Sequence, residues 1–160
     1  MSNPVDQEEL ALFRDAVIKA LETEVAPHYE AWEKSGIVPR ELWNTLGAAG
    51  MLCVDVPEDC GGCGAPFQYS VVVHSDIVAP YLSHIGNDEQ KQQWLPKMVS
   101  GEAVGAIAMT EPGAGSDLQA IRTSAVKDGG DYILNGSKTF ITNGQHADMV
   151  IVAAKTDPNA

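Results

Sequence analysis

The chain has 160 residues, of which 44% are hydrophobic and 20% charged, and its formal net charge is −12. This length suits one ordinary domain or two small ones, and the hydrophobic share excludes a disordered chain. The acidic balance argues against nucleic acid and anionic membranes as partners. No apolar stretch approaches the roughly 18 residues that span a bilayer, so we expect no stable membrane insertion.

The first part of the chain carries the spacing of helices. Asp6 is the expected N-cap of a helix from about residue 7 to the mid-thirties, loosened near Pro27 and ended by Ser35-Gly36. Pro39 suits the first turn of a second helix, and Gly50 is its expected stop. The apolar stripe of the first helix consists of Leu10, Phe13, Val17, Leu21 and Val25.

Two further helices are expected before residue 101. Residues 67–85 are predicted to be helical, with an interruption around residues 74–80. Asn87 is the expected cap of the next helix, with Gln90 at its N3 position. The apolar stripe of that helix is Trp94, Leu95 and Met98, and we expect Trp94 in the core. Pro96 should bend the helix or start a new turn.

After Gly101 the pattern changes to that of strands. Asp128-Gly129-Gly130-Asp131 is a hairpin turn signal. Helices followed by strands favour an α+β fold in two layers or two domains over βαβ units. The segments predicted to be strands are 104–109, 120–126, 132–134, 139–142 and 149–153.

The three cysteines raise the question of a metal or redox site. Cys60-Gly61-Gly62-Cys63 has the C-x-x-C spacing of both kinds of site, and Cys53 leaves an odd thiol. A structural zinc needs four ligands, and no second pair stands at a suitable spacing. We therefore interpret Cys60 and Cys63 as thiols on a glycine turn and predict no metal site.

Two longer strings carry the chemistry. The first is Ala108-Met109-Thr110-Glu111-Pro112-Gly113-Ala114-Gly115-Ser116-Asp117. Its glycines can take conformations closed to other residues, and the exposed N–H groups of such a loop bind anions, phosphate above all. The second string is Gly136-Ser137-Lys138-Thr139-Phe140-Ile141-Thr142-Asn143-Gly144.

The two strings resemble signatures of the acyl-CoA dehydrogenase family, flavoenzymes that oxidise fatty acyl thioesters. The resemblance covers nearly the whole chain and is closest to the long-chain-specific members. Other matching segments are Glu24-Val25-Ala26-Pro27, Trp32-Glu33, residues 57–64, Gly86-Asn87-Asp88-Glu89-Gln90-Lys91, Gly105 to Met109 and Ile133 to Lys138.

The resemblance implies a cofactor site for FAD. Ile107, Met109 and Thr110 would lie along the flavin, with Thr110 beside an oxygen that gains negative charge on reduction. Gly115 and Ser116 would hold the pyrophosphate, and Ser116 would also touch the substrate. The flavin face would be formed by Phe140, Ile141 and Thr142, with the Phe140 ring stacked on the flavin and Thr142 donating to its N5 atom.

The resemblance also implies an architecture. Residues 1–100 would be an N-terminal all-α domain and residues 101–160 the start of the middle β-barrel domain, left incomplete. The family's C-terminal helical bundle, which holds the catalytic glutamate, is absent, so no residue of this chain is expected to be catalytic. The family usually has about one more helix between Val73 and His74, which implies a deletion or an omitted segment.

The reaction implied is the α,β-dehydrogenation of a fatty acyl-CoA to the trans-2-enoyl-CoA, in fatty acid β-oxidation. Electrons would pass to an electron-transfer flavoprotein, and the protein would be a homodimer or homotetramer. It would be cytoplasmic in a bacterium or, as a processed eukaryotic protein, in the mitochondrial matrix. Two alternatives stay open: a non-catalytic fragment or degenerate module that binds flavin or acyl-CoA, and an acyl-CoA oxidase, which peroxide formation would reveal.

Overall fold

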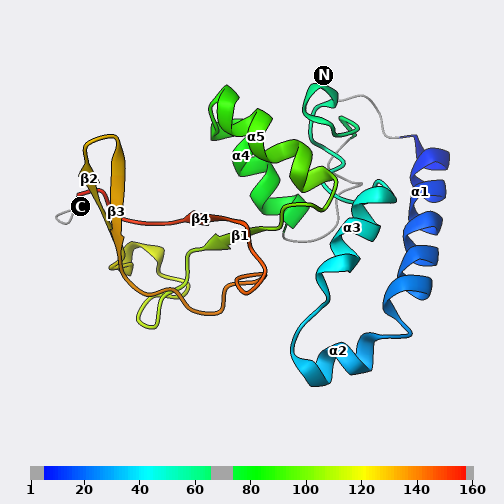
Figure 1. Cartoon of the computed structure of the whole chain (residues 1–160), viewed down its shortest axis with the longest axis horizontal. Helices are drawn as coiled ribbons and strands as arrows, with labels where there is room; N and C mark the ends of the chain where they lie inside the picture. The colour runs from blue at the N-terminus through cyan, green and yellow to red at the C-terminus, as the bar shows by residue number, and fades with distance from the viewer. Residues whose placement is uncertain (1–5, 66–73, 158–160) are drawn as a thin grey trace. The chain divides into compact units, whose positions relative to one another are not determined.

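The computed structural model describes residues 6–65 and 74–157, and the chain divides into two compact units, Met1–Val104 and Gly105–Ala160. In the described residues, the α-helices belong to the first unit and all four strands to the second (Figure 1). The α+β order predicted from the sequence is therefore confirmed. No helix among the described residues is long and apolar enough to cross a membrane.

The predicted first helix is interrupted. α1 (Gln7–Ala20) begins at Asp6, whose carboxylate accepts the N–H of Glu8 at 2.9 Å, as its expected capping role requires. A π-helical turn, Leu21–Val25, follows, and α2 (Tyr29–Ser35) comes after a break at 26–28, because Pro27 has no N–H to continue the helical ladder. The predicted stop after Ser35 is confirmed.

The next helix, α3 (Arg40–Ala48), starts one residue later than the predicted first turn. Pro39 is its N-cap, in an extended conformation, rather than its first helical residue. Gly50 has φ of +68° and its N–H donates to the Gly47 carbonyl, so the predicted glycine stop is confirmed. Trp43 is buried on this helix and anchors it to the core.

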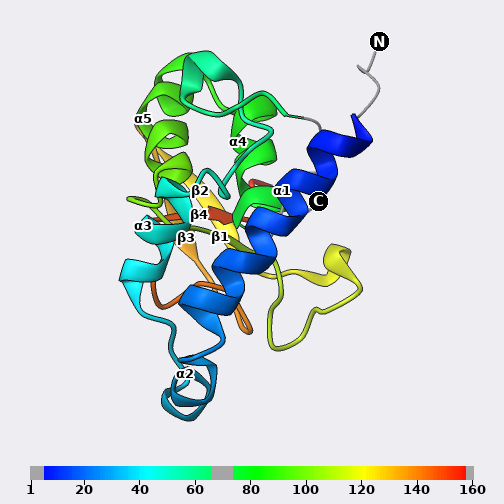
Figure 2. The same ribbon diagram turned by 90° about the vertical axis from the view of Figure 1, so that its right-hand side faces the viewer.

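Two helices lie side by side after residue 74, α4 (Ala79–Ile85) and α5 (Asp88–Val99) (Figure 2). A π-helical turn, His74–Val78, precedes α4, and the predicted helical residues 67–73 lie outside the described ones. Asn87 and Gln90 form the predicted capping box, with N···O distances of 2.9 and 2.8 Å. Trp94 is half-buried, so its placement in the core was wrong; its ring lies under the Lys97 ammonium at 6.0 Å.

The core of the helical unit also contains an imidazole. His74 is fully buried, its ring centroid lies 5.2 Å from that of Trp43, and its Nε2 is 3.1 Å from the Met98 carbonyl. Burial lowers the pKa of His74, which keeps the ring neutral. The buried apolar residues of this unit also come from the π-helical turn, α4, α5 and the loop before the Glu58–Cys60 turn: Leu52, Val54, Val56, Val78, Leu82, Leu95 and Met98.

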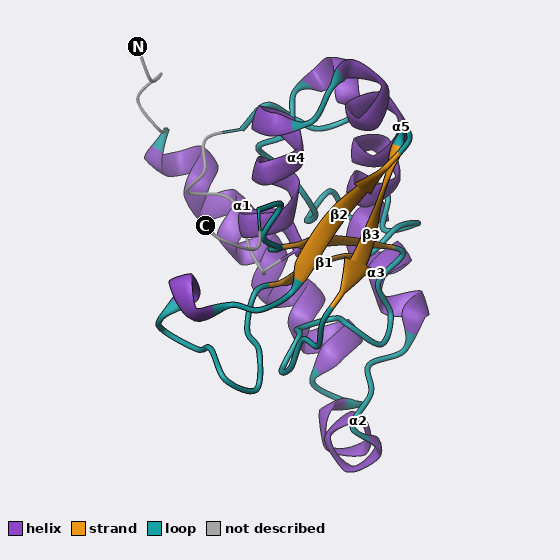
Figure 3. Cartoon of the chain, turned by 90° about the vertical axis from the view of Figure 1, so that its left-hand side faces the viewer, coloured by secondary structure: helices purple, strands orange, loops and turns teal. Residues whose placement is uncertain are grey.

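The second unit contains two pairs of strands. β1 (Gly105–Ala108) runs parallel to β4 (Met149–Val152), and β2 (Ser124–Asp128) is antiparallel to β3 (Asp131–Asn135), as Figure 3 shows. The β2–β3 turn is the predicted hairpin. Lys155, just after β4, exchanges backbone hydrogen bonds with Thr123 and Ala125, so the chain that leaves one pair joins the other.

Two predicted strands differ from the structure. The strand expected at 120–126 starts only at Ser124, because Leu118–Ala120 forms a 3-10 turn. The strand expected at 139–142 is absent from the described residues and was wrong. Phe140 and Asn143 both have left-handed backbone conformations, with φ of +57° and +65°, which no regular strand accommodates.

Candidate functional site

The two motif segments meet in the second unit. The first leaves the end of β1 and the second follows β3. The Thr139 N–H donates to the Thr110 carbonyl at 2.9 Å, and the Lys138 ammonium donates to the Met109 carbonyl at 2.9 Å. On the other side, the Ala153 N–H donates to the Ala108 carbonyl at 3.0 Å. Three consecutive carbonyls at the end of β1 are thus held by other segments.

The loop after β1 turns back on itself at residues 111–114. The N–H of Glu111 donates to the Ala114 carbonyl at 2.9 Å, and the Ala114 N–H donates back at 3.1 Å. Neither Gly113 nor Gly115 has a left-handed φ, so the expected special glycine conformations were wrong. Pro112 sets the turn by its fixed φ, and an ordinary tight turn results.

The loop nevertheless presents free donors. Within the described part of the chain, the backbone N–H groups of Gly113, Gly115 and Ser116 donate no hydrogen bond to any other group. All three residues are exposed. A run of such N–H groups can bind an anion without a basic side chain.

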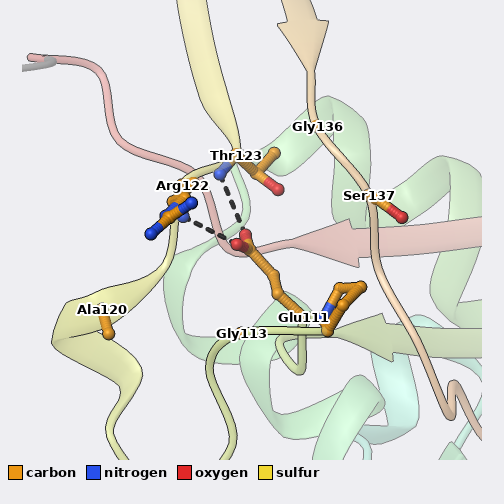
Figure 4. Close-up of a pocket in the computed structure, with 8 residues that line it drawn as sticks. Glu111, Gly113, Ala120, Arg122, Thr123, Gly136 and Ser137 are labelled. Atoms are coloured by element: carbon orange, nitrogen blue, oxygen red, sulfur yellow. Dashed lines mark hydrogen bonds between the residues drawn. The ribbon is translucent and has the colours of Figure 1, made fainter.

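The Glu111 carboxylate is the central electrostatic feature of the site (Figure 4). It accepts the N–H of Arg122 at 2.7 Å, the N–H of Thr123 at 2.9 Å and the Lys138 ammonium at 2.9 Å. The Thr123 hydroxyl is also buried beside it, although among the described residues that oxygen has no partner of good geometry. Together the Thr123 hydroxyl, the Arg122 N–H and the Lys138 ammonium lower the pKa of Glu111 to about 2.

This carboxylate should make the second unit sensitive to acid. Its pKa is lower in the folded state than the ordinary value of 4.5, so its stabilising effect is complete above that value and is lost as the pH falls toward about 2. We expect Glu111→Gln to reduce the acid-induced loss of stability over this range. The amide NMR signals of residues 105–157, recorded as the pH is lowered, measure this loss. An identical acid profile for the variant and the wild type would contradict this role of Glu111.

A pocket of about 280 Å³ opens beside this carboxylate. It contains none of the residues that the resemblance assigns to the flavin. The residues that the resemblance assigns to the flavin lie instead in β1, in the loop after it and in residues 140–142, outside this pocket. The pocket is lined by Glu111, Pro112, Gly113, Ala120, Arg122, Thr123, Gly136 and Ser137.

Two of the residues predicted to face the flavin ring are Phe140 and Thr110. Phe140 is 95% exposed, and its left-handed backbone projects the ring away from the packed interior. The Phe140 ring is therefore accessible to a ligand. Among the described residues, neither the N–H nor the hydroxyl of Thr110 has a hydrogen-bond partner.

The other residues predicted to bind FAD lie in β1, in the loop after it and in the turn after Phe140. Ile107 is half-buried in β1 and pairs in register with Ile151 of β4, and Met109 is half-buried. Ile141 is half-buried and Thr142 exposed, at the start of a turn whose Gly144 N–H donates to the Ile141 carbonyl. No described hydrogen bond joins Gly115 or Ser116 to the 138–142 segment.

Two residues of the second motif have contacts for which the sequence reasoning assigned no role. Lys138 links the motifs, as described above. Asn143 donates from Nδ2 to the Gly105 carbonyl at 3.3 Å and so ties the turn after Thr142 to the start of β1. The first motif contains two acids, Glu111 and Asp117, and the partner of Lys138 is Glu111.

The cysteines are free thiols in the structure. Cys53 is buried, and burial is the main cause that raises its pKa to about 12, so this thiol is unreactive. Cys60 is half-buried and Cys63 exposed. Among the described residues, no three His, Cys, Asp or Glu side chains are grouped so that they could hold a metal ion.

Comparison with known proteins covers nearly the whole chain. It matches the family model of the acyl-CoA dehydrogenase middle domain over residues 106–160 and that of the N-terminal domain over 7–73 and 63–102. It is 47% identical to the mitochondrial long-chain specific acyl-CoA dehydrogenase of Sus scrofa over 165 aligned positions, which cover 93% of this chain and 38% of that protein. The alignment has 165 positions, more than the 160 residues of this chain. The relative therefore has residues in this region that this chain lacks.

Solved structures agree with the sequence matches. An acyl-CoA dehydrogenase from Geobacillus kaustophilus has a TM-score of 0.91 and 51% identity, covering 99% of this chain and 46% of that one. An acyl-CoA dehydrogenase from Bacillus anthracis, solved in complex with FAD, has a TM-score of 0.83 and 30% identity, covering 97% and 30%. The chain thus spans less than half the length of the relatives it matches. By its two domain matches, it belongs to the acyl-CoA dehydrogenase family.

Proposed function

We propose that this chain supplies the helical domain and the first part of the β domain of an FAD-dependent acyl-CoA dehydrogenase. The substrate would be a fatty acyl-CoA of medium to long chain, and the product the trans-2-enoyl-CoA. The observation that carries the proposal is the junction of the two motifs. There the free donors of Thr110 and the exposed Phe140 ring belong to segments held together by the Thr139 and Lys138 hydrogen bonds.

The residues present fit FAD. The isoalloxazine ring needs an aromatic face and donors for its polar edge, which Phe140, Thr110 and Thr142 can supply. The pyrophosphate needs donors without a requirement for net positive charge, which the free N–H groups of Gly115 and Ser116 can supply. This explains how a chain of charge −12 can bind an anionic cofactor.

The bound FAD would supply the two-electron oxidation. The chain's own residues would bind and orient the reactants: Ile107, Met109 and Ile141 would pack along the ring, and Ser116 would touch both FAD and substrate. We place the general base in the part of the relatives' length that this chain does not span. We further propose a homodimer or homotetramer that passes electrons to an electron-transfer flavoprotein, in bacterial cytoplasm or the mitochondrial matrix.

The proposal is tested by titrating the purified chain with FAD and with riboflavin, followed by flavin fluorescence and visible absorbance. Saturable binding of both supports a flavin site, and no binding of either by the folded chain contradicts it for this chain. Turnover of an acyl-CoA with an artificial electron acceptor, measured separately, distinguishes a dehydrogenase from a binding module. Peroxide formation would indicate an oxidase.

Ser116→Glu should weaken FAD binding about 10- to 100-fold, because hydrogen bonds to a charged group are worth about 1.5–3 kcal/mol and a carboxylate repels the pyrophosphate. Riboflavin has the same ring without the pyrophosphate and serves as the control ligand. Its affinity should not change. Equal losses for the two ligands would contradict the assignment of Ser116 to the pyrophosphate.

A further inference from the structure

A buried ion pair joins the two motifs at one point. The Lys138 ammonium is 2.9 Å from both the Met109 carbonyl and Oε1 of Glu111. The side chains of Lys138 and Glu111 are only 11% and 6% exposed. Removing two charges from water is costly, and their attraction offsets that cost only when hydrogen bonds satisfy both groups. Here the carboxylate also accepts two backbone N–H groups, so the pair is held in one geometry.

The pair fixes how the end of β1 is oriented. The Met109 carbonyl is bound by Lys138 and the Thr110 carbonyl by the Thr139 N–H. Because both carbonyls are held by the 138–139 segment, residues 109–110 cannot rotate without breaking a charged hydrogen bond. The Thr110 N–H belongs to the same peptide as the Met109 carbonyl and has no partner among the described residues, so it is held in a defined direction.

We propose that Lys138 is a positioning residue that orients the Thr110 N–H toward the flavin ring, with Glu111 fixing the lysine. This inference rests on the proposed flavin site. It distinguishes two parts of that site: Lys138 acts on the ring, through Met109 and Thr110, whereas Ser116 acts on the pyrophosphate. A purely structural lysine would affect folding without this selectivity.

The test uses four forms of the chain: wild type, Lys138→Arg, Glu111→Gln, and the double variant Glu111→Gln with Lys138→Met. The double variant removes both charges, so no unpaired charge is left buried. Lys138→Arg is the matched control, because it retains a positive charge and N–H donors at this position. Hydrogen–deuterium exchange of residues 109–114 is measured first, without flavin. The affinities for riboflavin and FAD and the visible absorption band of the bound flavin are measured next.

We expect the double variant to exchange faster over residues 109–114, to lose about tenfold in affinity for riboflavin and FAD alike, and to shift the flavin band. Lys138→Arg, which retains charge and donors, should remain within about threefold of the wild type. Glu111→Gln leaves the buried lysine without its carboxylate, so residues 109–114 should exchange faster and riboflavin affinity should fall, as in the double variant. Unchanged exchange and unchanged riboflavin affinity in a folded double variant would overturn the proposal.

Folding is judged by the exchange of β2 and β3, and Lys138→Gln replaces the double variant if that variant does not fold. The shorter glutamine cannot span both partners, so the same losses are expected from it. If the wild type binds no flavin, the proposed function fails for this chain. In that case unchanged exchange of residues 109–114 in the variants would overturn the positioning role. Faster exchange would support the part of the proposal that Lys138 holds residues 109–110 in place.

Discussion

Gly101→Ala is expected to destabilise the helical unit by about 3 kcal/mol or more, since a left-handed backbone and a steric overlap add together. The φ of Gly101 is +77°, a conformation that costs a residue with a Cβ about 1–2 kcal/mol. A Cβ there would also overlap the Trp43 carbonyl, which is backbone and cannot move without shifting α3. Urea unfolding followed by tryptophan fluorescence measures this loss, because all three tryptophans lie in this unit.

Two other glycines separate the causes. Gly50 has φ of +68° but no neighbouring atom within 4 Å of an added Cβ, so Gly50→Ala should lose only the conformational part. Gly47 lies inside α3, where alanine ordinarily stabilises by about 1 kcal/mol. Its Cβ would overlap the Ser100 carbonyl, so Gly47→Ala should destabilise instead. Equal losses at Gly50 and Gly101 would show that steric overlap contributes nothing.

Much of the fold could be predicted because its signals are local. Asn87 with Gln90 caps a helix through side chains three residues apart, and the Gly129-Gly130 turn closes a hairpin between adjacent strands. Trp94 shows where local reasoning stops. Helical spacing placed it on an apolar stripe, yet how deeply a side chain is buried depends on which elements pack against it, and Trp94 remains half-buried.

The sequence identified the two motifs of the candidate site, but it did not predict their backbone geometry. Phe140 has a β-forming side chain in a β-like string, but its left-handed backbone follows from the turn and tethers around it, including Asn143 on Gly105. Similarly, Gly113 was expected to need special backbone angles, and the Glu111–Ala114 hydrogen bonds make an ordinary turn sufficient. The Phe140 outcome depends on a contact between segments far apart in the sequence, which no local pattern contains. The turn at Gly113 is local, and it is closed by hydrogen bonds between residues three apart that need no left-handed glycine.

Gly136→Ala is expected to destabilise the second unit by about 1–3 kcal/mol, the usual cost of overfilling a packed position. An added Cβ at residue 136 would lie 2.7 Å from the Cα of Thr123 and would overlap its hydroxyl. Thr123 cannot retreat freely, since its N–H is bound by Glu111 and its carbonyl accepts the Lys155 N–H. The chain at 136 would have to move instead, and Lys138 would move with it.

Gly113→Ala is the matched control for this prediction. It lies in the other motif, has no left-handed φ, and has no atom within 4 Å of an added Cβ. It should leave the stability of the unit unchanged or slightly raised, because alanine restricts the unfolded chain. Hydrogen–deuterium exchange of β2 and β3 measures both variants. A stable Gly136→Ala with wild-type exchange would mean that β3 tolerates displacement from Thr123, and that the position of Lys138 is less constrained than its hydrogen bonds indicate.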